Sequence, residues 1–209
     1  MTKTITRVYD DYASAEETVS ELRGAGLGAS HIGLVASNAD GWHRPGAGSV
    51  SPVHDKDRDG RDDRAEGAVT GGSLGAILGG AAGAAAGLGM IAIPGIGPVV
   101  AAGWLAALAA GGVGGGVAGG LIGALVESGT SKENAQLYAE ALRRGGAIVT
   151  ARVSDDDEAQ YAAIMDHRAY DVMERGKIWR DEGWSGYDPD APVYTADEVR
   201  RERESYHRH

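Results

Sequence analysis

The residues best placed to carry out chemistry lie in the stretch "DKDRDGRDDRAE", residues 55–66. Its acids follow the spacing D-x-D-x-D-G-x₅-E of a calcium loop, where carboxylate oxygens bind the ion and a glycine permits the sharp turn. The candidate calcium ligands are Asp55, Asp57, Asp59, Asp63 and Glu66.

The same stretch also fits a second interpretation. Position 8 of a calcium loop is usually apolar, but here it is Asp62, and lysine and arginine alternate with the acids. No helix is predicted before the loop. We favour a solvated, self-neutralising linker that keeps the hairpin away from the sandwich, and the calcium loop stays open as the second interpretation.

Other chemistry has little support in the sequence. The chain has no cysteine, which excludes disulfides, thiolate metal sites and a cysteine nucleophile. Two glycine patterns of the dinucleotide-binding type, at 87–92 and 114–119, do not follow predicted strands, and no Walker sequence is present. We therefore expect no enzymatic activity, no cofactor other than calcium and no small-molecule substrate.

Glycine spacing is the dominant pattern of the chain. No charged residue or histidine occurs between Glu66 and Glu127. Glycines four residues apart lie on one helix face and let another backbone approach closely, although each costs about 1 kcal/mol relative to alanine in a helix. The glycines predicted to pack helices or subunits are Gly71, Gly75, Gly79, Gly83, Gly87, Gly103, Gly111, Gly115, Gly119 and Gly123.

The sequence "IPGIGP", residues 93–98, divides this uncharged stretch and predicts a turn. We expect a glycine-zipper helical hairpin with arms at 67–92 and 98–126. Its apolar outer face has three possible destinations: a membrane, other copies in a soluble assembly, or the rest of the chain. We favour the membrane, with both ends of the hairpin on the cytoplasmic side.

The flanking sequence predicts a small α+β domain. Strands are expected at 4–9, 31–36, 147–153 and 170–175, with intervening helices whose predicted caps are Ser14, Thr130 and Ser154. Strand, helix and strand occur once before the glycine-rich stretch and once after it. Two such units are typical of a split β-α-β, or ferredoxin-like, sandwich with helices on one face of an antiparallel sheet.

These expectations divide the chain into five parts. They are the first half of the sandwich (1–36), an acidic Gly/Asp-rich loop (37–66), the helical hairpin (67–127), the second half of the sandwich (128–175) and a C-terminal tail (176–209). Thr195 and Glu198 form a capping box for a short charged helix in the tail. Trp179 and Trp184 are predicted to hold the tail against the sandwich.

Charge and the N-terminal sequence indicate the compartment. The net charge of −10 disfavours nucleic acid as a partner. The first residues, "MTKTITRVYDDYAS", lack the apolar core of a signal peptide. We expect a cytoplasmic protein associated with the cytoplasmic membrane.

Three stretches resemble the general stress protein 17M-like, or YflT-like, family of heat-induced and low-temperature-induced stress proteins. They are "TRVYDDYASAEETVSELRGAGL", the glycine-rich arms around "AIPGIGP", and "RRGGAIVTARV", and the resemblance covers about residues 4–175. It implies a stress-induced role and supplies no catalytic residues.

Together, these observations predict a non-enzymatic stress-response protein that forms homo-oligomers through its glycine-zipper hairpin at the membrane. The alternative is a soluble oligomeric binding or sensor module whose acidic loop takes calcium.

Overall fold

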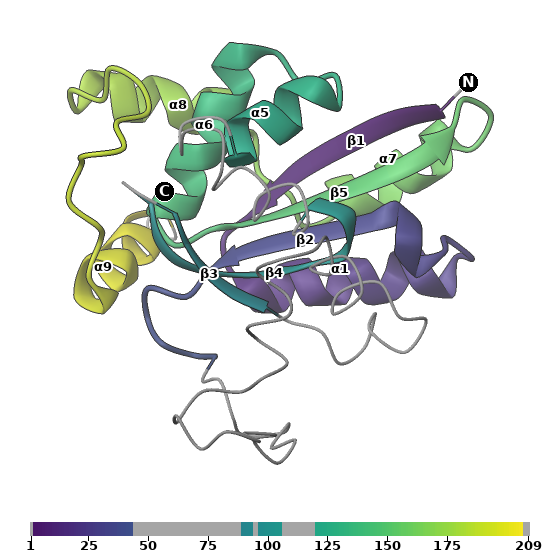
Figure 1. Ribbon diagram of the computed structural model, residues 1–209, viewed down its shortest axis with the longest axis horizontal. Coiled ribbons are helices and arrows are strands. Elements are labelled where there is room, and N and C mark those ends of the chain that lie inside the picture. The colour runs from purple at the N-terminus through teal and green to yellow at the C-terminus, as the bar shows by residue number, and fades with distance from the viewer. Residues whose placement is uncertain (1, 44–88, 94–95, 106–119, 207–209) are drawn as a thin grey trace, which may run out of the picture.

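The computed structural model describes residues 2–43, 89–93, 96–105 and 120–206 (Figure 1). Its strands are β1 (Thr2–Tyr9), β2 (Ile32–Ser37), β3 (Gly89–Ile93), β4 (Gly97–Ala102) and β5 (Ala147–Ser154). Its helices are α1 (Tyr12–Gly24), the short 3₁₀ helix η1 (Ala29–His31), α5 (Gly120–Glu127), α6 (Lys132–Arg143), α7 (Glu158–Asp166), α8 (Val172–Asp181) and α9 (Ala196–Tyr206). The predicted α+β class is confirmed.

One antiparallel sheet organises these elements, with strand order β1-β5-β2-β4-β3. Strands β1 and β2 are parallel to each other, because each pairs antiparallel with β5 between them. Helix α1 connects β1 to β2. The first half of the chain therefore forms the expected β-α-β unit. Strand β5, from the second half, lies between its two strands.

The second half departs from the prediction of a strand at 170–175. Only Tyr170 makes a β-bridge, to Val8 on the outer side of β1. Helix α8 begins directly afterwards, because the Asp171 side chain accepts hydrogen bonds from the backbone N–H groups of Met173 and Glu174. The strand prediction is wrong, although Tyr170 lies where that strand would pair.

The helical hairpin is also wrong for the residues around its turn. Residues 89–93 and 97–102 form β3 and β4, which pair with each other, and β4 pairs with β2. The β-branched residues of this stretch favour strands, and Gly97 has the positive φ (104°) of a tight connection. The turn lies inside the predicted range 93–98 but joins two strands. Residues 67–88 of the first predicted arm and residues 106–119 of the second lie outside the described residues.

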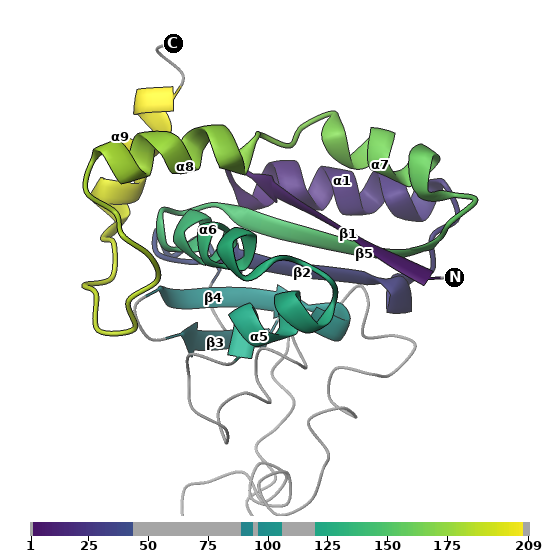
Figure 2. The same cartoon turned by 90° about the horizontal axis from the view of Figure 1, so that it is seen from above.

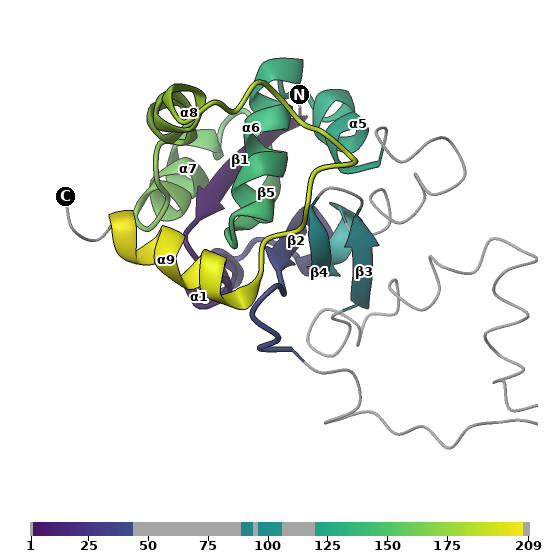
Figure 3. The same ribbon diagram turned by 90° about the vertical axis from the view of Figure 1, so that its left-hand side faces the viewer.

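Helices cover both faces of the sheet, whereas the sequence predicted helices on one face. Helices α1 and α7 cover one face, and α5 and α6 cover the opposite face (Figure 2 and Figure 3). The first face buries Tyr9, Leu22 and Met165 in one core, and the second buries Leu125, Leu137 and Trp179 in another. The additional layer is built by the residues just before β5.

Helix starts differ from the predicted caps by one to three residues. Asp11, rather than Ser14, caps α1, and Ser131, rather than Thr130, caps α6. Ser154 accepts a hydrogen bond from the backbone N–H of Asp157 just before α7. The capping box of Thr195 and Glu198 at the start of α9 is confirmed by hydrogen bonds in both directions.

Within the described residues, the longest apolar helix falls short of what is needed to cross a membrane.

Candidate functional site

Most residues singled out from the sequence lie outside the described part of the chain. This holds for the five candidate calcium ligands and for all of the zipper glycines except Gly103 and Gly123. Among the described residues, no group of three or more acids and histidines is arranged to hold a metal ion. The calcium prediction therefore stays a prediction.

The two zipper glycines that are described have different surroundings. Gly103 follows β4 with a φ of 73°, and a Cβ there would lie 2.1 Å from the carbonyl oxygen of Ile32. Gly103 thus packs against strand β2, and its predicted role in a helix–helix contact is wrong. Gly123 lies in α5 as predicted, and a Cβ there would meet no atom of the described residues within 4 Å.

Among the described residues, Glu140 and Arg144 are the buried charged side chains, and a polar group is centred on Arg144 at the end of α6. Its Nε donates to Oε1 of Glu140 at 2.7 Å, and both side chains are buried, with exposures of 8% and 3%. Its Nη1 donates to Glu202 of α9 at 2.5 Å and to Glu182 at 3.1 Å. Arg144 thereby joins α6 to the C-terminal part of the chain.

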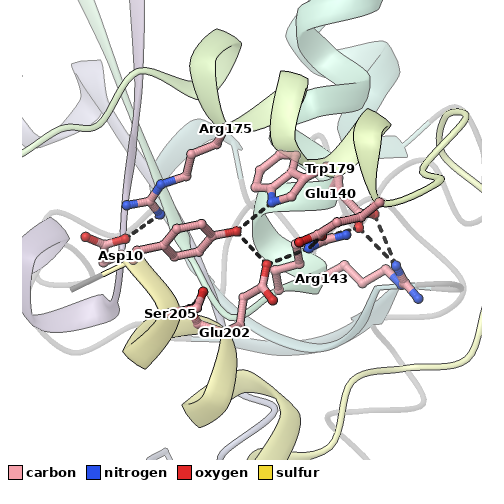
Figure 4. A network of polar contacts seen from close by, with 10 residues as sticks. Asp10, Glu140, Arg143, Arg175, Trp179, Glu202 and Ser205 are labelled. Carbon is pink, nitrogen blue, oxygen red and sulfur yellow. Dashed lines mark hydrogen bonds and ion pairs between the residues drawn. The ribbon is translucent and has the colours of Figure 1, made fainter. Parts of the chain in front are cut away.

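Aromatic side chains complete this group, which we call the Arg144 cluster: Glu140, Arg144, Trp179, Glu202 and Tyr206. The indole Nε1 of Trp179 donates to the Tyr206 hydroxyl at 2.6 Å, and that hydroxyl donates to Glu202 at 2.5 Å (Figure 4). The Arg144 guanidinium also lies over the Trp179 ring, 5.0 Å from its centre.

Two further arginines extend the contacts toward the first half of the chain. Arg175 of α8 pairs with Asp10 (Figure 4). Its guanidinium also lies over the rings of Tyr170 and Tyr206, 3.4 Å and 4.0 Å from their centres. Arg203 of α9 donates to Asp40 at 3.0 Å and also to the carbonyl oxygens of Gly145 and Asp10. Charge-assisted hydrogen bonds therefore hold helix α9 to three separate parts of the domain, at Asp10, at Asp40 and at Arg144 with Gly145.

The pKa values reflect this pairing. Burial alone would lower the pKa of Arg144, but its hydrogen bonds to Glu140 and Glu202 outweigh burial and raise it. Burial, followed by the hydrogen bond to Glu202, raises the pKa of Tyr206, and burial raises that of Tyr170. These groups are held in their ordinary charge states at neutral pH, with the arginine cationic and the tyrosines protonated.

The space inside this polar region is too small for a substrate. Its cavity has a volume of about 10 Å³ and is lined by Asp10, Arg144, Tyr170, Arg175 and Trp179, among others. A cavity of this size is near the lower limit for one water molecule. The arrangement therefore holds α9 on the domain, and the charged groups of the cluster are paired with one another.

Apolar contacts from the same tail reinforce the attachment. Val193 packs on Gly97 at the β3–β4 turn, and Val199 of α9 packs on Gly145 after α6. A Cβ at either glycine would lie within 2.3 Å of a valine methyl group. The tail thus contacts the turn of the β3–β4 hairpin as well as the Arg144 cluster.

The sequence predicted only part of this site. Trp179 is buried and Trp184 packs against the same core, as expected for residues that hold the tail. The ion pairs were missed, although Glu140 and Arg144 stand four residues apart in a predicted helix, which is the spacing of a helical ion pair. The partners from α9 have no such local signal, because they are about sixty residues away.

Comparison of the chain with protein-family models, with curated proteins and with solved structures finds no match.

Proposed function

We propose that this chain is a non-enzymatic stress-response protein that self-assembles through two glycine-repeat segments, residues 67–88 and 106–119. One observation carries the proposal. Gly89 pairs with Ala101 at the open end of the β3–β4 hairpin, and Gly103 bridges to Gly33. The first segment therefore ends, and the second begins, at the same end of one strand pair.

This arrangement supports a packing role for the repeated glycines. Two segments that leave a rigid hairpin side by side are already close, so pairing them costs less entropy than pairing distant segments. Small residues at every fourth position then let helices approach closely. In this proposal the α+β domain, a ferredoxin-like sandwich with its fourth strand replaced by α8, is the frame for the segments.

Segment length bears on the place of assembly. As helices, 22 and 14 residues would be about 33 Å and 21 Å long, against a bilayer core of about 30 Å. Both segments are uncharged, which favours contact with a membrane, but the second is short for a span. We propose association with the cytoplasmic membrane through these segments, with the α+β domain facing the cytoplasm.

A non-catalytic role is supported by how the domain uses its enclosed polar groups. In the Arg144 cluster, one guanidinium pairs with both carboxylates, and Arg144, Trp179, Glu202 and Tyr206 line a cavity of about 10 Å³. Its groups hold α9, so their function is structural.

A calcium-dependent sensor is the alternative, favoured by the D-x-D-x-D-G-x₅-E spacing at 55–66. It predicts that millimolar calcium raises the melting temperature of the full chain and that Asp55→Ala with Asp59→Ala removes the effect. An unchanged melting temperature in calcium would rule this alternative out.

Membrane fractionation followed by sizing tests the main proposal. The test variant carries Gly79→Leu and Gly83→Leu, which fill the glycine face. The matched control carries Ala81→Leu and Ala85→Leu, which add leucines about 200° around a helix from that face.

We expect the wild type and the control to resist carbonate washing, to be released by detergent and to elute as oligomers. The glycine variant should lose the oligomer. A soluble oligomer that still depends on the glycines would contradict only the membrane part. Equal oligomers in all three chains would contradict the role of the glycines.

A further inference from the structure

Strand β1 is an edge of the sheet, and most of its outer side has no strand beside it in the described part of the chain. Its inner side pairs with β5 over its whole length. On the outer side, the backbone N–H of Tyr170 donates to the carbonyl oxygen of Val8 at 3.1 Å. An edge of this kind is a template for a further strand.

The contact at Val8 identifies the backbone groups that face outward. In an antiparallel strand, alternate residues direct their N–H and C=O groups to opposite sides. Since Val8 faces Tyr170, the residues two, four and six positions earlier also face outward. They are Thr6, Thr4 and Thr2, and each offers a donor and an acceptor to an incoming strand.

A cleft lies beside the C-terminal part of β1, next to this edge. It has a volume of about 330 Å³ and is lined by residues of β1, α6, α7 and α8, among them Thr6, Asn134, Tyr138, Asp166 and Met173. Thr6 is only 6% exposed, and its hydroxyl has no hydrogen-bond partner among the described residues. A buried hydroxyl of this kind indicates a position for another polar group.

The charges that usually protect an edge strand are neutralised here. Lys3 donates to Glu158 at 2.6 Å, and Arg7 pairs with Asp166; both carboxylates belong to α7. The even-numbered threonines lie on the opposite face from these pairs, because side chains alternate along a strand. The edge therefore combines an uncharged threonine row with cations that are already paired.

We propose that two copies of this chain pair through their β1 edges, antiparallel, with Thr4 opposite the partner's Thr4. Thr6 then lies opposite the partner's Thr2, whose hydroxyl gives the Thr6 hydroxyl its missing partner. Three outward-facing pairs exchange about six backbone hydrogen bonds, because each such pair exchanges two. The two five-stranded sheets become continuous across the dimer.

Charge selects this register over its neighbour. With Ile5 opposite the partner's Ile5, Lys3 would lie opposite the partner's Arg7, and like charges directly opposite each other are destabilising. With Thr4 at the centre, Lys3 lies opposite the partner's Ile5. A second copy suits the edge as its occupant because the threonine row is complementary to itself.

This dimer uses a different surface from the glycine-repeat segments, so it does not rest on the proposed function. The two inferences can succeed or fail separately. Both the wild-type chain and the variant with Gly79→Leu and Gly83→Leu serve as backgrounds for the experiment.

Disulfide cross-linking tests the register, since the chain has no cysteine of its own. Paired Thr4 residues would have Cα atoms about 5.5 Å apart, within disulfide reach, whereas Thr2 would lie about 14 Å from the partner's Thr2. Under mild oxidation, Thr4→Cys should form covalent dimer at least about tenfold faster than the more exposed Thr2→Cys, which is the matched control. The ratio should be the same in both backgrounds.

Equal cross-linking rates for Thr4→Cys and Thr2→Cys would overturn the proposal. Thr4→Pro provides a second test, because it removes one outward N–H without touching the ladder to β5. In the glycine-variant background, Thr4→Pro should convert a dimer into a monomer in sedimentation velocity, with an unchanged circular dichroism spectrum. A folded Thr4→Pro chain that remains dimeric would also overturn it.

Discussion

The two β-α-β halves of this domain start alike and end differently. In the first, β1 and α1 lead into β2, a strand paired on both sides in the middle of the sheet. In the second, β5 and α7 lead to a single bridge at Tyr170, and the chain turns into α8. One capping aspartate, Asp171, starts a helix where the repeat would place a strand.

The difference changes what holds each half together. The first half is held by strand ladders and an apolar core, whereas the end of the second half is held by α8, α9 and the Arg144 cluster. It also leaves β1 as an edge. The comparison shows that the loss of one strand from a repeated unit leaves an open edge in the sheet. The neighbouring helices then make the contacts that hold this end of the fold.

The largest expected effect comes from breaking the Arg144 cluster. Glu140→Ala leaves the buried Arg144 without its most buried carboxylate partner and should reduce the free energy of unfolding by about 3 to 5 kcal/mol. Glu182→Ala removes a partner of the same arginine that is 55% exposed, and should cost about 0 to 1 kcal/mol. Urea unfolding of both variants measures the difference. Similar losses in the two would contradict a buried attachment of the second half.

Truncation in the core tests whether the two halves share it. Leu22 of α1 and Met165 of α7 are both fully buried in the same core. Leu22→Ala and Met165→Ala should each cost about 2 to 5 kcal/mol in urea unfolding. Ile178→Ala, on the exposed side of α8, is the control and should stay within about 0.5 kcal/mol of wild type. A small loss of stability for Met165→Ala, with a large loss for Leu22→Ala, would contradict a core shared by the two halves.

The stability at alkaline pH tests a tyrosine that joins the two halves. Tyr9 of β1 donates its hydroxyl hydrogen bond to the carbonyl oxygen of Met165 in α7 at 3.0 Å. Burial raises the pKa of Tyr9 to about 12. Because the folded pKa exceeds the unfolded value of about 10, this stabilisation is complete below pH 10 and is lost as pH rises toward 12.

The expected loss from Tyr9 across that range is about 2 to 3 kcal/mol, at 1.36 kcal/mol per pKa unit. The stability of the wild type and of Tyr9→Phe should be measured by urea unfolding between pH 8 and 11.5. Other buried tyrosines contribute in the same direction, so the difference between the two slopes isolates Tyr9. Identical slopes would contradict the raised pKa.

The smallest effect is expected at the residue that distinguishes the halves. Asp171→Ala removes the cap of α8 and should cost about 1 kcal/mol. Asp171→Asn keeps a capping oxygen and should reduce the free energy of unfolding by only about a few tenths of 1 kcal/mol. Amide hydrogen exchange in the first turn of α8 should increase in the alanine variant. Unchanged exchange there would mean that the cap does not start the helix.

Much of the fold was predictable because its signals are local. The β-branched residues of β1, β2 and β5 predict these strands, and the Thr195–Glu198 capping box predicts the start of α9. The strands β3 and β4 were missed because glycine periodicity outweighed Ile91, Ile93, Val99 and Val100, whose types favour strands. Tertiary pairing with β2 decided that stretch, and no helical pattern could reveal it.

The candidate site was less predictable, for a different reason. Trp179 could be predicted to hold the tail because it is a large aromatic residue in a polar segment. Its partners come from α6 and α9, and the Arg144 to Glu202 contact joins residues 58 positions apart. Such contacts depend on how the tail packs against the end of α6 and the residues after β1 and β2. The open edge of β1 was missed because the predicted strand at 170–175 would have covered it.

The native mass of the full chain, measured by light scattering, tests the central claim most directly. We expect a large oligomer for the wild type and for the control with Ala81→Leu and Ala85→Leu. We expect a dimer for the variant with Gly79→Leu and Gly83→Leu, and a monomer when Thr4→Pro is added. A glycine variant that keeps the wild-type mass would contradict the claim that the glycine-repeat segments build the assembly.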